Sequence, residues 1–361
     1  MKNQLLPLFL IMVLAVSAAS WVLYHQHEPE ARTEQVLFPE LRTQASSITQ
    51  IKLQNNTGVL LHAQRRGDSW YSLSSADAMF PVNNNNLSNL LVQLRDARLL
   101  EAKTANPARY AKLGVDSLRE ITETPSKEDD LKGTDIDAMG TLITLSGAKT
   151  FQVILGNTAT SGLGNYARVP NNEQAWLLDQ VIELPENSVD WLVQPLLDIQ
   201  EEEITRVSRI DESGWQIQRN EETGELVLQP HENGHSLRYD GVLDAMLSNI
   251  TSLRFDAIAA REEISDINSV MSQLLIQSQR GDVELRVFES EDSAWLTFDT
   301  LNENWQHLTQ HRFGITEFTA RQLSKSMEDF LPEAGDIKTD VDADVLEIDE
   351  GNEPSGVETL D

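Results

Sequence analysis

The histidines are the side chains whose spacing comes nearest to that of a metal site. His307 and His311 lie four residues apart, as do His231 and His235, and on one helix face this spacing lets two imidazoles share an ion. A zinc-protease helix carries glutamate next to its first histidine, whereas this chain has Leu308. The residues around the first pair alternate as in a strand, where four residues cover about 13 Å, too far for both histidines to bind one ion. The second pair flanks an Asn-Gly turn instead of lying on a helix. We therefore predict that neither pair holds a metal.

A glycine-rich stretch, residues 156–164, has the composition of a loop that cradles phosphate. Residues 162–167 fit the G-x-G-x-x-A dinucleotide pattern, but that pattern needs a following helix whose N-terminus faces the pyrophosphate. Pro170 and its neighbours make residues 166–176 a strand and a turn instead. Leu163 also stands where a phosphate loop needs lysine. The stretch is therefore predicted to be the loop of a β-hairpin.

Asp340, Asp342 and Asp344 imitate the start of a calcium-binding loop. That loop needs glycine at its sixth position and a bidentate glutamate at its twelfth, where this chain has Val345 and Gly351. The chain has no cysteine, which excludes disulfides, thiolate metal sites and a cysteine nucleophile, and it has no Gly-x-Ser-x-Gly elbow. Some of its 58 acidic residues must meet in space, but no spacing selects a pair for acid–base work. The sequence therefore predicts no catalytic, cofactor-binding or metal residue.

The composition is that of a globular and strongly acidic chain. Its 361 residues suffice for about two domains, and a hydrophobic content of 40% can fill their cores. With 28 basic against 58 acidic residues, the formal charge of -30 opposes binding to phosphate backbones. Nucleic acid is therefore not an expected partner.

The N-terminal residues predict a membrane anchor. Leu5 to Leu23 is a run of nineteen uncharged residues, which as a helix would span about 28 Å, close to the hydrocarbon thickness of a bilayer. Lys2 precedes this run, which by the positive-inside rule places the N-terminus in the cytoplasm. The side chains expected to hold the helix in the membrane are Leu5, Phe9, Val13, Trp21 and Leu23. We expect residues 1–24 to cross a bacterial inner membrane once, with the body in the periplasm.

The alternative is a cleavable signal peptide with Ser17-Ala18-Ala19 as its cleavage site. The apolar run is longer than the core of a usual signal peptide, and it ends in aromatic residues suited to the membrane interface. These two features favour a retained anchor. Both alternatives export the rest of the chain.

Beyond the anchor, the hydrophobic pattern predicts an α+β body with antiparallel sheets. Alternating apolar and polar residues predict strands at 48–53, 59–64, 70–73, 141–145, 150–155, 274–279, 283–288 and 295–298. Asn83 to Asn86 precede leucines at helical spacing, so an asparagine is expected to cap a helix over residues 87–97.

Two segments of this body share one hydrophobic pattern. Shifting the chain by 156 positions (204 minus 48) places Ile48 on Ile204 and Leu87 on Leu243, together with most apolar residues near them. Polar positions agree poorly, as expected for a shared core with divergent surfaces. We therefore predict two similar modules in tandem.

The predicted organisation has five parts, of which the anchor is the first. Residues 25–37 are expected to be a charged linker, and residues 38–198 and 199–332 the two modules, with a short helix around Trp191 at the seam. Residues 333–361 are acidic and contain no aromatic residue, so they cannot bury enough apolar surface to offset their ordering entropy. This tail is therefore expected to be disordered.

The segment from Lys103 to Val115, KTANPARYAKLGV, resembles the most recognisable stretch of the DUF4340 family. Phe80-Pro81, Gly156 and the segment around Asp190 also resemble that family's pattern, and the likeness covers the anchor and most of residues 38–330. The resemblance selects six residues, for which structural roles in packing and turns are expected: Tyr110, Leu113, Gly114, Tyr166, Arg168 and Trp191.

What the resemblance implies about function is limited, because the family is a domain of unknown function and supplies no catalytic residues. Its members are typically single-anchor envelope proteins, often encoded beside an ABC-2 type permease and a gliding-motility-like ABC auxiliary protein. We therefore expect a membrane-anchored periplasmic accessory protein that binds a partner or substrate of an ABC-type transport system, without a cofactor. The alternatives are a hydrolase of envelope polymers that uses carboxylates distant in sequence, and a purely structural envelope scaffold.

Overall fold

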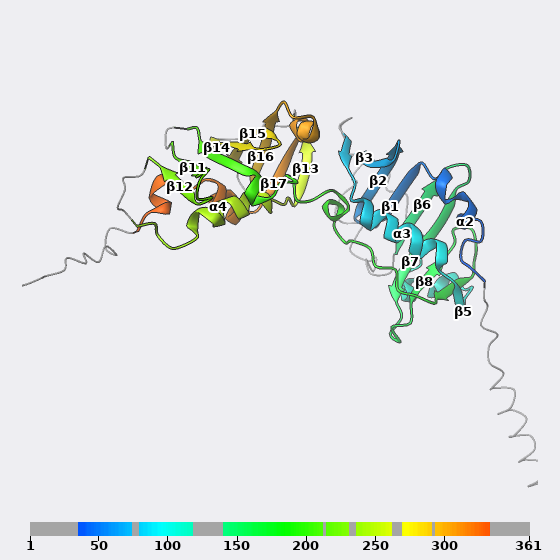
Figure 1. Cartoon of the computed structure of the whole chain (residues 1–361). Coiled ribbons are helices and arrows are strands. Elements are labelled where there is room, and N and C mark those ends of the chain that lie inside the picture. The colour runs from blue at the N-terminus through cyan, green and yellow to red at the C-terminus, as the bar shows by residue number, and fades with distance from the viewer. Residues whose placement is uncertain are drawn as a thin grey trace, which may run out of the picture.

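The computed structural model describes residues 35–73, 79–117, 140–211, 214–230, 236–261, 269–290 and 293–332. These residues form two β-sheets with few helices, and the two sheets lie one after the other along the molecule (Figure 1). Within both sheets every neighbouring pair of strands is antiparallel. The chain is therefore an α+β protein with two antiparallel sheets, as the sequence predicts.

The first sheet has nine strands in the order β4-β3-β2-β1-β6-β7-β8-β9-β5. Its strands are β1 (Gln50–Asn55), β2 (Gly58–Arg66), β3 (Ser69–Leu73), β4 (Met79–Pro81), β5 (Leu99–Thr104), β6 (Thr141–Ser146), β7 (Phe151–Thr158), β8 (Asn165–Arg168) and β9 (Ala175–Leu178). This order places β4 and β5 at the two edges.

The second sheet has eight strands in the order β12-β11-β10-β14-β15-β16-β17-β13. Its strands are β10 (Ile204–Arg209), β11 (Gln216–Arg219), β12 (Leu226–Gln229), β13 (Ala257–Ala260), β14 (Ser269–Ser278), β15 (Gly281–Glu289), β16 (Ala294–Thr300) and β17 (His311–Ile315). Apart from β4, each strand of the first sheet has a counterpart at the same place in the second. Thus β4 is the strand that distinguishes the two sheets.

The helices are short and few. They are α2 (Leu41–Gln44), α3 (Asn84–Asp96), α4 (Val242–Thr251) and α5 (Glu317–Leu323), with the 3-10 helices η1 (Ala45–Ser47), η2 (Pro107–Arg109), η3 (Ala111–Leu113), η6 (Ser188–Trp191), η7 (Glu201–Glu203), η9 (Glu303–Gln310) and η10 (Met327–Phe330). α3 precedes the edge strand β5 as α4 precedes the edge strand β13. The two sheets therefore agree in the position of their main helix as well.

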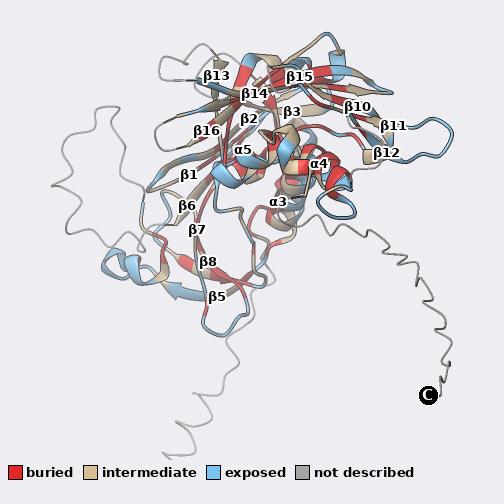
Figure 2. Cartoon of the chain, turned by 90° about the vertical axis from the view of Figure 1, so that its left-hand side faces the viewer, coloured by how far each residue is buried: buried red, intermediate tan, exposed pale blue. Residues whose placement is uncertain are grey.

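Side-chain alternation decides which face of each strand is buried. In β1, Ile51 and Leu53 are fully buried, whereas Lys52 between them points to the opposite face and is half-buried. Figure 2 shows the same distribution over the whole chain, with buried residues along the strands and on α4. Apolar burial on one face of each sheet is therefore the main source of stability.

Helix α3 begins where the asparagines predict it. The Asn83 side chain accepts hydrogen bonds from the backbone N–H groups of Asn85 and Asn86, which otherwise have no partner inside the helix. Leu87, Leu90 and Leu94 follow at helical spacing and are buried.

Residues just before the predicted start of the first module already pair with it. Its expected end is residue 37, but Val36 forms a β-bridge with Arg98, and the Leu37 N–H donates to the Ala97 carbonyl at 2.8 Å. Leu37 is also buried. Residues 35–37 therefore pair with the first module. The sequence does not reveal this, because Val36 and Leu37 are only two apolar residues after a charged stretch.

The seam helix is shorter than predicted. The sequence predicts a short helix that is capped by Asn187 or Ser188 and ends near Asp198, whereas η6 ends at Trp191 and Leu192 is already extended. Pro195 lacks an N–H and restricts Gln194 before it, so a helix cannot continue through this segment.

Several predictions concern residues outside the described ranges. They are the anchor with Leu5, Phe9, Val13, Trp21 and Leu23, the pair His231 and His235, the aspartates from Asp340 to Asp344, and the tail 333–361. Among the residues that the structure does describe, no helix is both long and apolar enough to cross a membrane.

Candidate partner-binding groove

The segment around η6 is hydrogen-bonded to both modules. Towards the first module, the Val193 N–H donates to the Pro81 carbonyl at 3.0 Å, and the Asn83 N–H donates to the Trp191 carbonyl at 2.8 Å. Towards the second, the Leu196 N–H donates to the Leu253 carbonyl at 2.9 Å. The seam is therefore a fixed structural element that both modules share.

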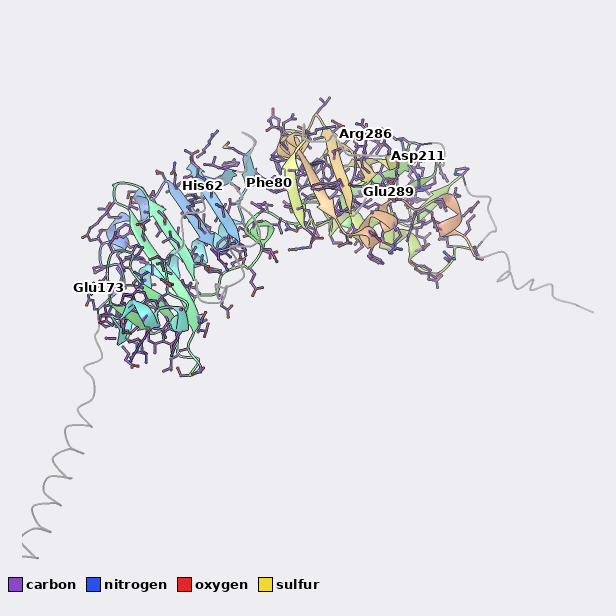
Figure 3. All side chains as sticks on the ribbon, turned by 180° about the vertical axis from the view of Figure 1, so that it is seen from behind. His62, Phe80, Glu173, Asp211, Arg286 and Glu289 are labelled. Atoms are coloured by element: carbon purple, nitrogen blue, oxygen red, sulfur yellow. The ribbon has the colours of Figure 1, made fainter. Side chains whose placement is uncertain are left out.

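Phe80, on the edge strand β4, supplies the main apolar contact between the modules. Its ring lies against four rings of the second module, at centroid distances of 5.7 Å to Phe255, 5.6 Å to Phe313, and 5.4 Å to both His307 and His311. Figure 3 shows Phe80 where the first module meets the second. We call Phe255, His307, His311 and Phe313 the ring socket. Phe80 and its socket belong to the main buried cluster, which contains residues of both modules.

The two histidines of the socket lie on a 3-10 helix and the strand that follows it. The sequence predicts a strand over residues 305–310, and this prediction is wrong: these residues are part of η9, and β17 begins at His311. The His311 Nδ1 lies 2.9 Å from the His307 carbonyl oxygen. Among the described residues, no group of three His, Asp or Glu side chains is placed to hold a metal ion. Their position makes these histidines packing groups of the junction.

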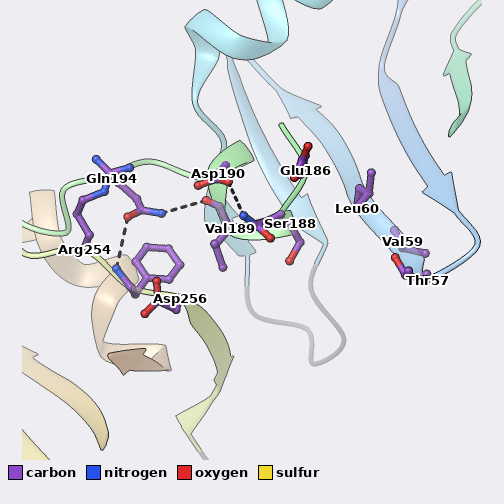
Figure 4. Close-up of a pocket in the computed structure, with 13 residues that line it drawn as sticks. Thr57, Val59, Leu60, Glu186, Ser188, Val189, Asp190, Gln194, Arg254 and Asp256 are labelled. Carbon is purple, nitrogen blue, oxygen red and sulfur yellow. Dashed lines mark hydrogen bonds between the residues drawn. The ribbon is translucent and has the colours of Figure 1, made fainter. Parts of the chain in front are cut away.

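A groove of about 580 Å³ opens beside this junction (Figure 4). Three segments line it: the β1–β2 turn with the start of β2, the seam, and the stretch between α4 and β13. The lining residues are Thr57, Gly58, Val59, Leu60, Glu186, Asn187, Ser188, Val189, Asp190, Gln194, Arg254, Phe255 and Asp256. The first module therefore supplies one wall and the second supplies another, with the seam between them. Its volume lies in the range of about 300–1,000 Å³ typical of ligand sites.

Gln194 fixes the distance between the seam and the wall from the second module. Its side-chain amide donates to the Val189 carbonyl at 3.2 Å, and its amide oxygen accepts from the Phe255 N–H at 3.4 Å. Figure 4 shows both bonds. Phe255 is also a member of the ring socket, so the groove wall and the junction share a residue.

The charges of the groove are available to a ligand. Glu186, Arg254 and Asp256 are exposed, and Asp190 is half-buried with its Oδ2 accepting from the Asn187 amide at 3.0 Å. Within the described ranges, none of the four charged groups forms an ion pair. The groove therefore offers three carboxylates and one guanidinium, an excess of negative charge, to a partner.

A wider depression of about 1140 Å³ on the second module is less suited to binding. Apart from the exposed Glu303, its charged lining residues are engaged with one another or with their neighbours, as in the 2.9 Å contact between Arg261 and Asp299 and the 3.0 Å contact between Arg280 and Glu203. A ligand would have to break these pairs. The groove at the junction needs no such exchange.

Five of the six residues selected by the resemblance lie together, away from the groove. Tyr110, Leu113, Tyr166 and their buried neighbours form a small cluster of their own on the first sheet, separate from the main core. The Arg168 guanidinium lies 4.5 Å from the Tyr110 ring centroid. Trp191 is elsewhere, fully buried in the seam. The resemblance therefore marks one site of packing and one residue of the junction.

Arg168 holds the segment that covers this cluster. It is buried, and it donates from Nε to the Val115 carbonyl at 2.9 Å and from an Nη to the Ser117 hydroxyl at 2.8 Å. A third, longer bond of 3.4 Å reaches the Asn172 carbonyl. Arg168 therefore acts as a structural clamp, which uses its donors on the chain itself.

Glycines let this segment lie directly on the sheet. Gly114 has a φ of +67°, and Gly156 of β7 lies so close that an added Cβ would be 2.3 Å from the Leu113 carbonyl oxygen. The glycine-rich stretch from Gly156 therefore serves packing, and its remainder is the loop between the antiparallel strands β7 and β8, as predicted.

The sequence alone singles out no residue of the groove as functional. The groove residues between positions 186 and 194 are noticed only because they lie near the predicted seam. Thr57, Glu186 and Asp256 lie on three separate connections, and no spacing relates them. Phe80 is noticed only as part of the resemblance, without a role.

A family model described as a domain of unknown function, DUF4340, matches residues 74–269, which is more than half of the chain. The match begins just before β4 and ends at the start of β14, so it covers the seam and the whole stretch that supplies Phe80, Gln194 and Phe255. No curated protein and no solved structure matches the chain.

Proposed function

The chain belongs to the DUF4340 family, a domain of unknown function, and we propose that it is a membrane-anchored accessory protein that binds a partner protein in the groove between its modules. The observation that carries this proposal is a groove of about 580 Å³ whose four charged groups form no ion pair within the described residues. Ligand sites are concave and combine an apolar surface with a few free polar groups. Here Val59, 49% exposed, and Leu60 supply the apolar part.

The lining of the groove indicates the chemistry of the partner. Three carboxylates against one guanidinium, on a chain with a formal charge of -30, favour a segment that carries lysine or arginine. A segment of a protein fits better than a small molecule because the groove is open along the junction and has walls from both modules.

The sequence supports a place for this binding at the bacterial inner membrane. The apolar run from Leu5 to Leu23 is long enough to anchor the chain, and Lys2 before it favours a cytoplasmic N-terminus with the body in the periplasm. The family resemblance further implies a gene that is often encoded beside an ABC-2 type permease. We therefore propose a component of an ABC-type transport system as the partner.

Catalysis is less well supported than binding. A hydrolase that uses two carboxylates would hold at least one of them buried, so that its pKa rises. Among the residues that the structure describes, no aspartate or glutamate is buried, and those of the groove are exposed or half-buried. The described carboxylates therefore give no support to the hydrolase alternative.

Photo-crosslinking in intact cells tests the proposal. A photoreactive amino acid at Val59, on the groove wall, should capture a component of the transport system, and the same residue at Val227 of β12 should not. The two valines make a matched pair, with exposed fractions of 49% and 42%, and only Val59 lines the groove. Equal capture from both positions, or no capture from Val59, would reject the groove as the binding site.

Charge neutralisation tests the chemistry of the partner. We expect the double variant Glu186→Gln and Asp256→Asn to lower the yield of crosslinked product by about two- to tenfold, since exposed ion pairs contribute about 0.2–1 kcal/mol each. The control is Glu221→Gln with Glu222→Gln, two exposed acids in the turn between β11 and β12 that change the net charge equally. Equal losses in both double variants would mean that only the net charge of the chain matters.

A further inference from the structure

The first sheet has one face on the main core and α3, and we call the opposite face its outer face. Ile51 and Leu53 of β1 belong to the main core, so Lys52 between them points to the outer face. His62 of β2 pairs directly with Lys52 and shares that face. Figure 1 shows the sheet from the α3 side, and Figure 3 shows it from the opposite side, with His62 labelled. Cross-strand pairing adds Gln50, Gln64, Arg66, Tyr71, Thr144 and Gln152 to the outer face.

The strands of the outer face carry cations that no acid neutralises. Of the 58 acidic residues in the chain, Glu101 is the one that lies on a strand of the first sheet, and Lys103 pairs with it at 2.6 Å. Within the described ranges, neither Lys52 nor Arg66 forms an ion pair. The outer face is therefore positive, on a chain with a formal charge of -30.

Residues 105–117, which we call the Tyr110 segment, add two more cations to the same side. The segment packs on Ile154 of β7, which alternates with core residues and so lies on the outer face. A 3-10 helix has three residues per turn, so Tyr110 and Leu113 share the side towards the sheet. Arg109 and Lys112 share the other side and are exposed. Packing therefore explains the residues selected by the resemblance, but it does not explain these two.

The corresponding face of the second sheet has the opposite character. Glu284 of β15 alternates with the core residues around it and pairs across the strands with Asp299 of β16, and Asp282 shares their face. On the first module, the described acids next to the Tyr110 segment are Asp116, which is half-buried, and Glu173, which is exposed. These two acids leave an excess of cations on the first outer face. The two similar sheets therefore differ in the charge that they present.

The chain that precedes residue 35 joins the molecule at the edge of the positive sheet. The Gln35 carbonyl accepts from the Leu99 N–H at 2.8 Å, and Val36 forms a β-bridge with Arg98. Residues 25–34 can span at most about 35 Å between the predicted anchor and this edge. The anchor therefore tethers the first module within that distance of the bilayer.

We propose that the outer face of the first sheet rests on anionic lipid headgroups of the membrane that anchors the chain. Lysine and arginine near an anionic surface each favour contact with it, and the amides of Gln50 and Gln64 with the Tyr71 hydroxyl add donors for headgroup phosphates. The cations are spread over two strands and the Tyr110 segment, so they match an extended surface better than a small ligand. Headgroups repel the acidic remainder of the chain, which turns this face towards the bilayer. The inference rests on the membrane anchor of the proposed function and is independent of the groove.

Energy transfer from the protein to lipid tests this contact. The chain has no cysteine, so Gln50→Cys, at an exposed position of β1, gives a unique site for a donor dye. The full chain is placed in nanodiscs that contain acceptor-labelled phosphatidylcholine, with or without about 30% phosphatidylglycerol. We expect a high-transfer population in the anionic discs and its loss in about 0.5 M salt, which screens the attraction. The same dye at Leu301→Cys, a fully exposed position of the second module, should show no such population.

Two double variants assign the contact to the outer face. Lys52→Gln with Arg66→Gln should lower the high-transfer population by about tenfold, because two attracted cations are lost. Arg206→Gln with Arg321→Gln removes the same charge from the second module and should leave the population unchanged. The pairs are matched, since Lys52 and Arg206 are half-buried and Arg66 and Arg321 are exposed. Equal losses in both double variants, or equal transfer in neutral and anionic discs, would overturn the proposal.

Co-elution with the discs separates this inference from the proposed function. Neutral discs hold the chain through its anchor alone, so failure to co-elute with them would reject the anchor. Co-elution with anionic discs that is lost in the double variant of Lys52 and Arg66 would still support the outer face. Where the anchor holds the chain in both kinds of disc, transfer from position 50 decides on the face.

Discussion

At the scale of single residues, Arg168 shows why a recognisable sequence segment need not be a binding site. A buried guanidinium normally needs acceptors for its donors, because leaving them without partners in the interior costs free energy. Here the Val115 carbonyl and the Ser117 hydroxyl supply acceptors, and the Tyr110 ring covers the guanidinium. The residues that carry the family resemblance are therefore explained by packing. The side chains that line the proposed binding groove lie elsewhere.

Gly114 gives a residue-scale prediction with a built-in control. Alanine at position 114 would have a positive φ of +67°, and its added Cβ would lie only 2.6 Å from Asn157 Oδ1. Alanine at position 162 would have a similar φ of +71°, but its added Cβ would have no atom within 4 Å. We expect Gly162→Ala to cost about 1 kcal/mol of unfolding free energy from backbone strain alone, and Gly114→Ala about 2–4 kcal/mol. Urea unfolding of the two purified variants measures the difference. Equal losses would show that Asn157 moves aside freely.

At the scale of elements, α3 and the strands β1, β2, β3, β6, β7, β14, β15 and β16 could be predicted because their signals are local, whereas short edge strands such as β4, β5 and β13 were not predicted. A strand period of two fits the alternation of Ile51, Lys52 and Leu53. A helix period of 3.6 fits the spacing of Leu87, Leu90 and Leu94. η9 could not be predicted, since Trp305 and Leu308 are three residues apart and the short run around them also fits a strand. The groove could not be predicted at all, because its three segments meet only once both sheets are formed.

The capping of α3 gives an element-scale prediction. Asn83→Ala removes the side chain that accepts from the N–H groups of Asn85 and Asn86, so the unfolding free energy should fall by about 1 kcal/mol. Asn84→Ala is the matched control, because Asn84 is exposed in the first turn and alanine favours the helix. Its unfolding free energy should be unchanged or slightly higher. A loss of the same size in Asn84→Ala would contradict the assignment of Asn83 as the cap.

At the scale of the whole molecule, two sheets with one strand order are joined by a strand that only the first sheet has. Edge strand β4 brings Phe80 to the second module, and the seam adds backbone hydrogen bonds to both modules. The main core therefore runs through both modules, with only a small second cluster around Tyr110 beside it among the described residues. A junction of this kind couples the folding of the modules while it leaves a groove between their walls.

Phe80→Ala tests whether this single ring couples the modules. Removing a buried phenylalanine costs about 3–5 kcal/mol, and here the loss falls on the contact between the modules. Calorimetric unfolding of the full chain should change from one transition to two, because each module would keep its own sheet and unfold separately. Phe38→Ala is the control, since Phe38 packs edge-to-face on Phe151 at 5.4 Å within the first module. That variant should lower the unfolding temperature without separating the transitions. If Phe80→Ala also unfolded in one transition, the seam and not the ring would be the coupling element.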